Sequence, residues 1–193
     1  MGKLMKLNLG CGNRILNGYC NVDKFGEPDV KIDLEMFPWP WPDNSVEEVL
    51  LIHVLEHLGQ SPDVFISVIK ELYRICNDHA KIKIIVPHPR HDHFIMDPTH
   101  VRPITPALIS MFSKKNNHSW LEQGGANTPL ALYHDVDFDI VSTSYTLAEP
   151  YQTDFNDGRI SLEDVVKAIA KYNNIATQIE INIVAVKSSL ENG

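Results

Sequence analysis

Cysteine and long apolar runs are both scarce in this sequence. The 193 residues include three cysteines, an odd number without a Cys-x-x-Cys pair, so neither a disulfide framework nor a sulfur-rich zinc site is indicated. No apolar run approaches the roughly 20 residues that span a bilayer. The first residues lead straight into a strand-like segment, without the apolar core of a signal peptide. We therefore expect reduced thiols, a cytoplasmic location and no membrane partner.

Positive charge is scarce as well. Lysine and arginine number 17 against 25 aspartates and glutamates, so the formal net charge is -8 at pH 7, and no basic run is longer than Lys114-Lys115. Because such a surface repels a phosphate backbone, we expect no nucleic-acid partner. With 44% hydrophobic residues and only 10 glycines, the chain has the composition of one globular domain, predicted to span residues 1–193. Nothing in the composition indicates an oligomeric state.

Short runs rich in valine and isoleucine predict strands that are buried on both faces. Such runs occupy residues 6–9, 20–23, 30–34, 48–53 and 80–86. Between the last two runs, apolar residues recur at helical spacing over 62–76, with Ser61 as the expected N-cap and Pro62 in the first turn. A strand, helix, strand crossover predicts a parallel pair.

The second half of the chain predicts an antiparallel edge. Its expected elements are strands at 138–147 and 177–186 around a helix at 161–172. Ser161 is expected to cap that helix, with Glu163 and Asp164 in the first turn. We therefore predict an α/β fold: a mostly parallel seven-stranded sheet with helices on both faces. Residues 88–135, with a helix near 105–115, are expected to form a lid or insertion on the substrate side.

Three of the expected strand ends carry residues that suit one ligand. Gly10 and Gly12 follow the first strand, where a sharp turn without Cβ atoms lets a ligand approach main-chain N–H groups. Asp23 ends the second strand, where a carboxylate accepts ribose hydroxyls, and Asp33 ends the third, where a nucleotide base would lie. Glycine and aspartate are also common turn residues, so a purely structural interpretation stays open.

Five segments, in order, resemble the motifs of class I S-adenosylmethionine-dependent methyltransferases, particularly the small type 11-like group. They are LNLGCG (7–12), NVD (21–23), DL (33–34), PDNSV (42–46) and HVLEHL (53–58). The resemblance covers about the first 87 residues and implies the Rossmann-like methyltransferase fold. Because only about ten residues separate Gly12 from Asp23, we expect a shortened first crossover, with a turn at 13–19 in place of a helix.

The resemblance also implies S-adenosylmethionine as the cofactor. It implies these contacts: Gly10, Cys11 and Gly12 with the methionine part, Asp23 with the ribose, Asp33 and the Leu34 main chain with the adenine, and His53 with the sulfonium end. A nicotinamide dinucleotide is the weaker alternative, because its fingerprint needs a third small residue where Ile15 stands.

Candidate catalytic residues follow the fourth and fifth strands. His57 stands in the region that reaches the reacting methyl in the family, although Glu56 and His57 could instead cap the following helix. The segment DPTHVR (97–102) looks like a recurrent feature of the type 11-like group. It makes His100 a candidate proton acceptor and Arg102 a candidate contact for a carboxylate or phosphate.

The histidines after the fifth strand leave one metal alternative open. His88, His91, His93, Asp97 and His100 offer imidazole and carboxylate ligands, but their spacing fits no ligand pattern on one helix or strand. We therefore predict no metal and interpret most of these histidines as solvated loop residues.

The sequence thus predicts an S-adenosylmethionine-dependent methyltransferase that acts on a small polar or sugar-like molecule. Oxygen is slightly favoured over nitrogen as the nucleophile, because the Pro-Pro-Tyr type of motif used for amines is missing after the fourth strand. Two alternatives remain. One is a module that binds S-adenosylmethionine without turnover, and the less favoured one is a metal-dependent hydrolase built on the histidine loop.

Overall fold

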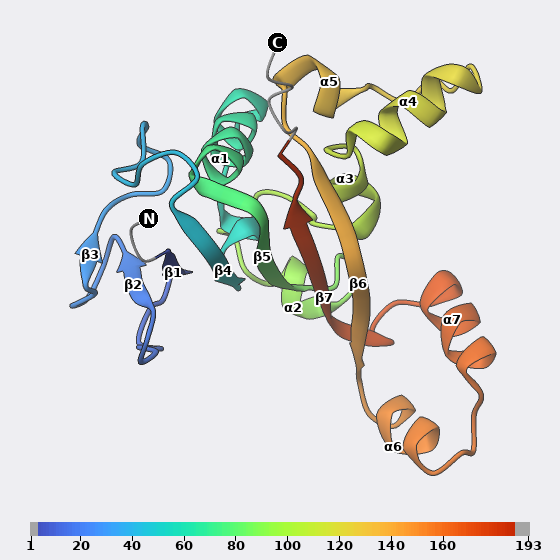
Figure 1. Cartoon of the computed structure of the whole chain (residues 1–193). Coiled ribbons are helices and arrows are strands. Elements are labelled where there is room, and N and C mark those ends of the chain that lie inside the picture. Colours follow the sequence, from blue (N-terminus) through green and yellow to red (C-terminus); the bar gives the residue numbers. More distant parts are fainter. Residues whose placement is uncertain (1–3, 188–193) are drawn as a thin grey trace.

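The part of the chain that the structure describes is built around one sheet of seven strands. This computed structural model describes residues 4–187, so the predicted domain limits at 1 and 193, and the start of the chain, lie outside the described residues. The strands lie in the order β3-β2-β1-β4-β5-β7-β6 (Figure 1). Their bounds are Met5–Leu9 (β1), Cys20–Asp23 (β2), Val30–Lys31 (β3), Val46–Ile52 (β4), Cys76–Pro87 (β5), Phe138–Leu147 (β6) and Ala176–Ala185 (β7).

The pairing directions confirm the predicted mixed sheet. Strands β1 to β5 pair in parallel, whereas β7 runs antiparallel to both β5 and β6. The antiparallel edge predicted for the last two strands is therefore confirmed. Strand β3 is shorter than predicted, because the chain turns at Asp33, whose Oδ1 accepts a hydrogen bond from the Glu35 N–H at 3.0 Å.

All helices of the described residues come after β4 in the chain. They are Leu55–His57 (the 3-10 helix η1), Pro62–Ile75 (α1), Asp92–Ile95 (α2), Pro106–Ser110 (α3), Lys114–Glu122 (α4), Leu130–His134 (α5), Tyr151–Asn156 (α6) and Leu162–Lys171 (α7). Residues 10–45, all of which the structure describes, contain no helix. The shortened first crossover is thus confirmed, and the second crossover is a loop as well.

Buried amides hold the first crossover loop where a helix is missing. The Asn8 Nδ2 donates to the Arg14 carbonyl at 2.8 Å and to the Asn21 Oδ1 at 2.9 Å, and that Oδ1 also accepts from the Leu16 N–H. Asp29 accepts two hydrogen bonds from Asn21, and these lower the pKa of its carboxyl group. Both asparagines are buried, and buried amides must find partners, so this network sets the path of the loop.

Both predicted N-cap residues stand at the start of their helices, but only one of them caps through its side chain. Ser161 and Asp164 form a capping box at the start of α7, as the sequence indicates. Ser61 is the N-cap residue of α1 and Pro62 opens the helix, both as predicted, but the Ser61 side chain accepts no hydrogen bond from the helix. Helix α1 is held instead by its buried stripe of Phe65, Val68, Ile69, Leu72 and Ile75.

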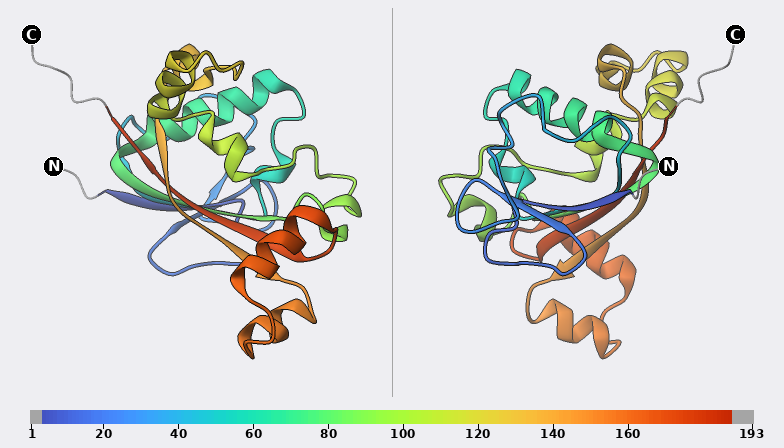
Figure 2. Two further views of the ribbon diagram at one scale, coloured as in Figure 1. Left: turned by 90° about the vertical axis from the view of Figure 1, so that its right-hand side faces the viewer. Right: turned by 60° about the vertical axis from the view of Figure 1, so that its left-hand side comes forward.

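The two faces of the sheet are covered unequally (Figure 2). Helices α1 and α3 lie on one side, against Ile82 and Ile84 of β5, which are almost fully buried. Lys81 is exposed on the opposite face, so the expectation of strands buried on both faces is wrong for β5. The physical reason is that the first two crossovers supply no helix. Helices α6 and α7 lie at the far end of β6 and β7, with α6 on the side opposite α1.

Residues 88–135 divide into two parts. The first part, up to about residue 103, follows the carboxyl end of β5. In the second part, Ile104, Ile109 and Phe112 are buried in the main core, and the Phe112 carbonyl accepts from the Phe138 N–H. Helix α5 leads directly into β6 at the opposite edge of the sheet (Figure 1). The predicted helix at 105–115 is two helices, α3 and α4, and the lid or insertion predicted for 88–135 stays a prediction.

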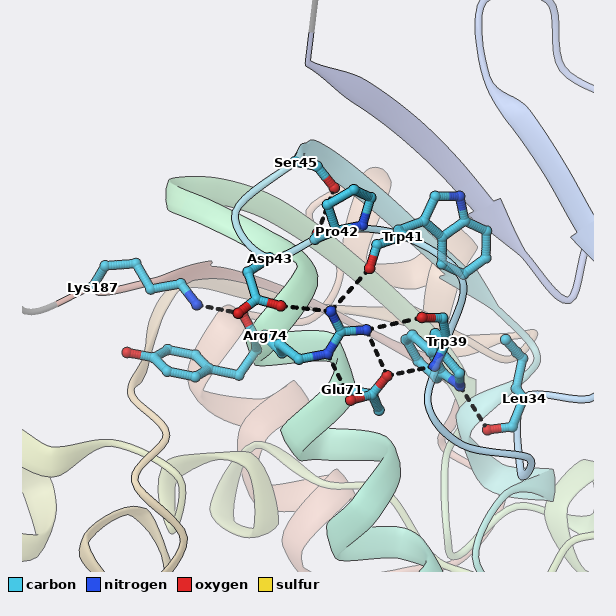
Figure 3. Close-up of polar contacts among 10 residues, drawn as sticks. Leu34, Trp39, Trp41, Pro42, Asp43, Ser45, Glu71, Arg74 and Lys187 are labelled. Atoms are coloured by element: carbon cyan, nitrogen blue, oxygen red, sulfur yellow. Dashed lines mark hydrogen bonds and ion pairs between the residues drawn. The ribbon is translucent and has the colours of Figure 1, made fainter. Parts of the chain in front are cut away.

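Arg74 clamps the loop before β4 onto α1 (Figure 3). Its guanidinium donates to both carboxylate oxygens of Glu71 at 2.8 Å, to the Asp43 carboxylate at 2.7 Å and to the carbonyls of Trp39 and Trp41. Glu71 in turn accepts from the Trp39 N–H at 2.6 Å. The pKa of Glu71 is lowered mainly by its hydrogen bonds to Arg74. A bidentate pair with three further contacts fixes this loop.

Candidate active site

A cleft opens at the carboxyl ends of β1, β2 and β4. We call it the strand-end cleft, and it is lined by Gly10, Asp23, Lys24, Ile32, Asp33, Leu34, Glu35, His53, Val54, His57 and Leu58. Five of the seven predicted cofactor contacts line this cleft: Gly10, Asp23, Asp33, Leu34 and His53. Cys11 and Gly12 do not line it. Of the three predicted catalytic residues, His57 lines the cleft, whereas His100 and Arg102 do not.

The glycine turn after β1 is shaped by a close approach to Val54. Gly10 has a φ of +64°, and a Cβ placed there would lie 2.4 Å from the Val54 Cγ2. Gly12 has a φ of +51° and open space where a Cβ would project. The Cys11 side chain between them is buried, and burial raises the pKa of its thiol. Any contact of Cys11 with a ligand would therefore come from the main chain.

Asp23 is held at the cleft by main-chain donors. Its Oδ2 accepts from the Gly12 N–H at 2.8 Å, and its Oδ1 accepts from the Phe25 N–H at 2.9 Å. Each carboxylate oxygen carries two lone pairs, so both oxygens keep acceptor capacity for a ligand. The glycine turn after β1 and the carboxylate after β2 therefore form one rigid unit.

Lys24 and Glu35 line the cleft beside Asp33, and the sequence interpretation missed both. The Lys24 Nζ lies 3.5 Å from the Asp33 Oδ2, and the Glu35 Oε1 accepts from the Gly59 N–H at 2.7 Å. The signal that could have found them is position, because each directly follows a strand-end motif. Leu34 is buried, and its carbonyl accepts from the Trp39 Nε1 at 3.1 Å, which ties the cleft wall to the clamped loop.

His53 directly follows β4 and has a strained backbone conformation. Its φ is +56°, which a non-glycine residue adopts only when its surroundings impose it. The His53 Nε2 lies 2.9 Å from the Gln178 Oε1, and Nδ1 lies 3.4 Å from the Glu56 Oε1. The pKa of His53 is raised, chiefly by the Glu56 carboxylate, against the opposing effect of burial. The imidazole is thus oriented from both nitrogens at the edge of the cleft.

His57 and His100 meet although they stand 43 positions apart in the sequence. Their ring centroids are 4.6 Å apart. The His57 Nδ1 lies 2.9 Å from the Thr99 Oγ1, and the His100 Nδ1 lies 2.8 Å from the Phe94 carbonyl. The structure therefore brings two of the three predicted catalytic residues together beside the strand-end cleft, with only His57 lining it.

Solved structures show which known fold this arrangement matches. No protein-family model matches the chain, and neither does any curated protein sequence. A methyltransferase dependent on S-adenosylmethionine from Archaeoglobus fulgidus aligns with a TM-score of 0.62 and 18% identity, over 95% of this chain and 86% of that one. The fold is that of the class I S-adenosylmethionine-dependent methyltransferases. This confirms the predicted fold class.

A second structure with the methyltransferase fold carries ligands. The 1,6-didemethyltoxoflavin-N1-methyltransferase of Burkholderia thailandensis, with 1,6-didemethyltoxoflavin and S-adenosylhomocysteine bound, aligns with a TM-score of 0.51. Its identity to this chain is 11%, over 95% of this chain and 71% of that one. Identities this low establish the fold alone.

Arg102 lies outside the strand-end cleft of the methyltransferase fold. Its Nη2 donates to the Gly59 carbonyl at 2.7 Å, and its guanidinium carbon lies 4.3 Å from the centroid of the Phe65 ring. It lines a separate groove beside α1. The main-chain N–H groups of Val101 and Arg102 both donate to the Glu56 carbonyl. This contact fastens the 97–102 segment beneath the turn after β4.

The other loop histidines have local structural partners. The His88 Nδ1 accepts from the Arg90 N–H at 3.2 Å, and the His91 Nδ1 accepts from the His93 N–H at 3.0 Å, which caps α2. Burial lowers the pKa of both His88 and His91. The prediction of solvated loop residues is therefore wrong for these two, because each is buried and shapes the loop.

Proposed function

We propose that this chain is an S-adenosylmethionine-dependent methyltransferase that acts on a small polar or sugar-like acceptor, with oxygen slightly favoured over nitrogen as the nucleophile. One observation carries the proposal. The strand-end cleft gathers Gly10, Asp23, Asp33, Leu34 and His53 from consecutive segments of the chain, at the sheet edge where ligands of open α/β folds bind.

The chemistry of the cleft suits the parts of this cofactor. The Asp23 carboxylate offers acceptors for ribose hydroxyls, and Asp33 offers an acceptor for an adenine amino group. Ile32 and Leu58 supply apolar wall for the base. Gly12 leaves open space at the turn, where a Cβ would otherwise intrude. We propose that these residues hold S-adenosylmethionine.

The bound cofactor would supply an electrophilic methyl group, and this chain would supply alignment. In-line displacement needs little covalent help, so positioning of the two reactants provides most of the acceleration. A base is needed only where the nucleophile must lose a proton. His57 lies in the cleft and His100 directly beside it, so we propose that this pair accepts the proton of a hydroxyl acceptor.

Two observations support the proposed class of methyl acceptor: the charge of this chain and a structurally similar enzyme with a small molecule bound. The net charge of -8 disfavours polyanionic nucleic acid, and Lys24 supplies a cation in the cleft for a polar small molecule. The Burkholderia thailandensis enzyme has a small molecule bound and is named for a nitrogen acceptor, so the acceptor atom here must come from product analysis. The three cysteines are free thiols, which supports a cytoplasmic location.

Calorimetry tests the cofactor site directly. We expect S-adenosylhomocysteine to bind with micromolar affinity and Asp23→Ala to weaken it at least tenfold, which corresponds to about 1.4 kcal/mol. Asp63→Ala, which removes an exposed carboxylate on α1, is the matched control and should bind as the wild type does. NADH should not bind. Absence of S-adenosylhomocysteine binding would overturn the proposal, whereas binding without turnover of any acceptor would favour a non-catalytic module.

A further inference from the structure

A compact group of metal-ligating side chains lies beside the strand-end cleft. Glu56 and His57 come from η1, and His100 comes from the segment after α2. One carboxylate oxygen of Glu56 and one nitrogen from each histidine all lie within 4.8 Å of one another. The notable partner is Glu56, which the proposed methyl transfer does not use.

Glu56 is a buried carboxylate without a hydrogen bond. Its side chain is 0% exposed, and neither oxygen has a hydrogen-bond partner among the described residues. The His53 Nδ1 lies 3.4 Å from Oε1 but lacks hydrogen-bond geometry. A buried charge costs several kcal/mol unless it is paired or coordinates a metal. The His53 imidazole can pair with Glu56, but it leaves both carboxylate oxygens without a hydrogen bond, so a metal ion would satisfy this buried side chain more fully.

The hydrogen bond at Nδ1 leaves the Nε2 of His57 available for an ion. The Thr99 hydroxyl donates to the Asp97 Oδ1 at 2.6 Å, so its oxygen is left to accept from the His57 Nδ1–H at 2.9 Å. A neutral imidazole that carries its proton on Nδ1 has its lone pair on Nε2. Metal-binding histidines are typically oriented by such a hydrogen bond from the other nitrogen.

His100 is oriented in the same way. Its Nδ1 must donate to the Phe94 carbonyl, 2.8 Å away, because a carbonyl oxygen only accepts. The lone pair of neutral His100 then lies on Nε2, which is 3.8 Å from the Asp97 Oδ2. His100 thus keeps Nε2 available for an ion, as His57 does.

We propose that Glu56, His57 and His100 bind a divalent first-row transition ion such as Zn²⁺ at the border of the strand-end cleft. Two imidazoles and one carboxylate form a donor set that suits zinc and its neighbours, whereas Mg²⁺ and Ca²⁺ prefer oxygen ligands. Three protein ligands also leave coordination positions open, as in catalytic sites. A bound ion would occupy the Nε2 lone pairs of His57 and His100, so ion binding and proton acceptance by this pair exclude each other. The alternative occupant of the space beside Glu56 is the His53 imidazole alone, whose Nδ1 lies 3.4 Å from Oε1.

Calorimetry with Zn²⁺ alone, on the full chain without cofactor, decides between these occupants. We expect one ion per chain and at least a tenfold weaker affinity in Glu56→Gln and in His100→Ala. Glu56→Gln keeps the side-chain volume, so we expect the variant to fold, and circular dichroism checks this. His93→Ala removes an exposed histidine of the same loop and should bind as the wild type does.

Two further measurements separate a site from adventitious binding. Co²⁺ should give visible absorption bands that Glu56→Gln abolishes, and Zn²⁺ should raise the melting temperature of the wild type but not of Glu56→Gln. No saturable binding, or equal affinity in wild type and His100→Ala, would overturn the proposal. S-adenosylhomocysteine binding is measured separately, so failure of the ion site and failure of the proposed function are distinguishable.

Discussion

Substitution of Gly10 by alanine tests how the glycine turn is built. Alanine at this position is strained twice. Its φ would remain near +64°, and its Cβ would lie 2.4 Å and 2.8 Å from the two Val54 methyl carbons. The left-handed conformation costs about 1–2 kcal/mol for a residue with a Cβ, and overpacking in a well-packed site typically costs about 1–3 kcal/mol. We therefore expect Gly10→Ala to lower the free energy of unfolding by roughly 2–5 kcal/mol.

Gly12→Ala is the matched control, because its φ is also positive but nothing lies within 4 Å of the added Cβ. Its expected cost is only the conformational part, about 1–2 kcal/mol. Val54→Ala should partly rescue Gly10→Ala, because it removes both clashing methyl groups and leaves the Val54 Cβ at 3.2 Å. Urea denaturation of the two single variants and the double variant then measures a favourable coupling of about 1–3 kcal/mol.

The same variants separate packing from ligand contact. Gly12→Ala should weaken S-adenosylhomocysteine binding more than it weakens folding, since its Cβ enters open space at the turn. Equal destabilisation by Gly10→Ala and Gly12→Ala, together with no rescue by Val54→Ala, would refute the reasoning, because the close approach to Val54 would then carry no energy.

Three further predictions concern side chains around the site. Glu71→Gln should destabilise the protein by about 2–3 kcal/mol at pH 7 because Arg74 loses its bidentate partner. The pKa of Glu71 lies below its ordinary value of 4.5, so the loss of stability in Glu71→Gln is fully present above pH 4.5 and shrinks as the pH falls. If urea denaturation found the same loss at pH 3, the stabilising role of the Glu71–Arg74 pair would be contradicted. Burial raises the pKa of Tyr73 to about 12, so its contribution to stability is complete below pH 10 and is lost as the pH rises from 10 to 12. Tyr73→Phe should flatten that alkaline decline, measured by urea midpoints at pH 9 to 12, although it also removes the hydrogen bond of 2.7 Å to the Val186 carbonyl. Arg102→Met should cost about 1–2 kcal/mol of stability through the lost hydrogen bond and leave S-adenosylhomocysteine affinity within twofold by calorimetry; a large loss of affinity would place Arg102 in the cleft after all.

Much of the fold could be predicted because its signals are local. Strand β2 was located from a short apolar run, and the capping box of α7 from residues three apart in the chain. The predictions of helix bounds and strand burial were wrong where contacts between distant parts of the chain determine the structure. Helices α3 and α4 replaced one predicted helix, because burial of Ile109 and Phe112 against the sheet and the Ser113 cap break the segment in two. Lys81 is exposed because no crossover helix covers that face of β5.

The candidate site shows the same division between sequence and tertiary structure. The common location of Gly10, Asp23 and Asp33 could be predicted from the sequence alone. Parallel strands bring their carboxyl ends to one edge of the sheet, whatever the details of packing. Only the tertiary structure placed His100 against Glu56 and His57 and turned Arg102 toward Gly59, since these contacts depend on how a loop after β5 folds back beneath the turn after β4. The strands and their pairing directions follow from local pattern and chain connectivity, whereas contact between side chains some 40 residues apart follows from packing that no short-range pattern encodes.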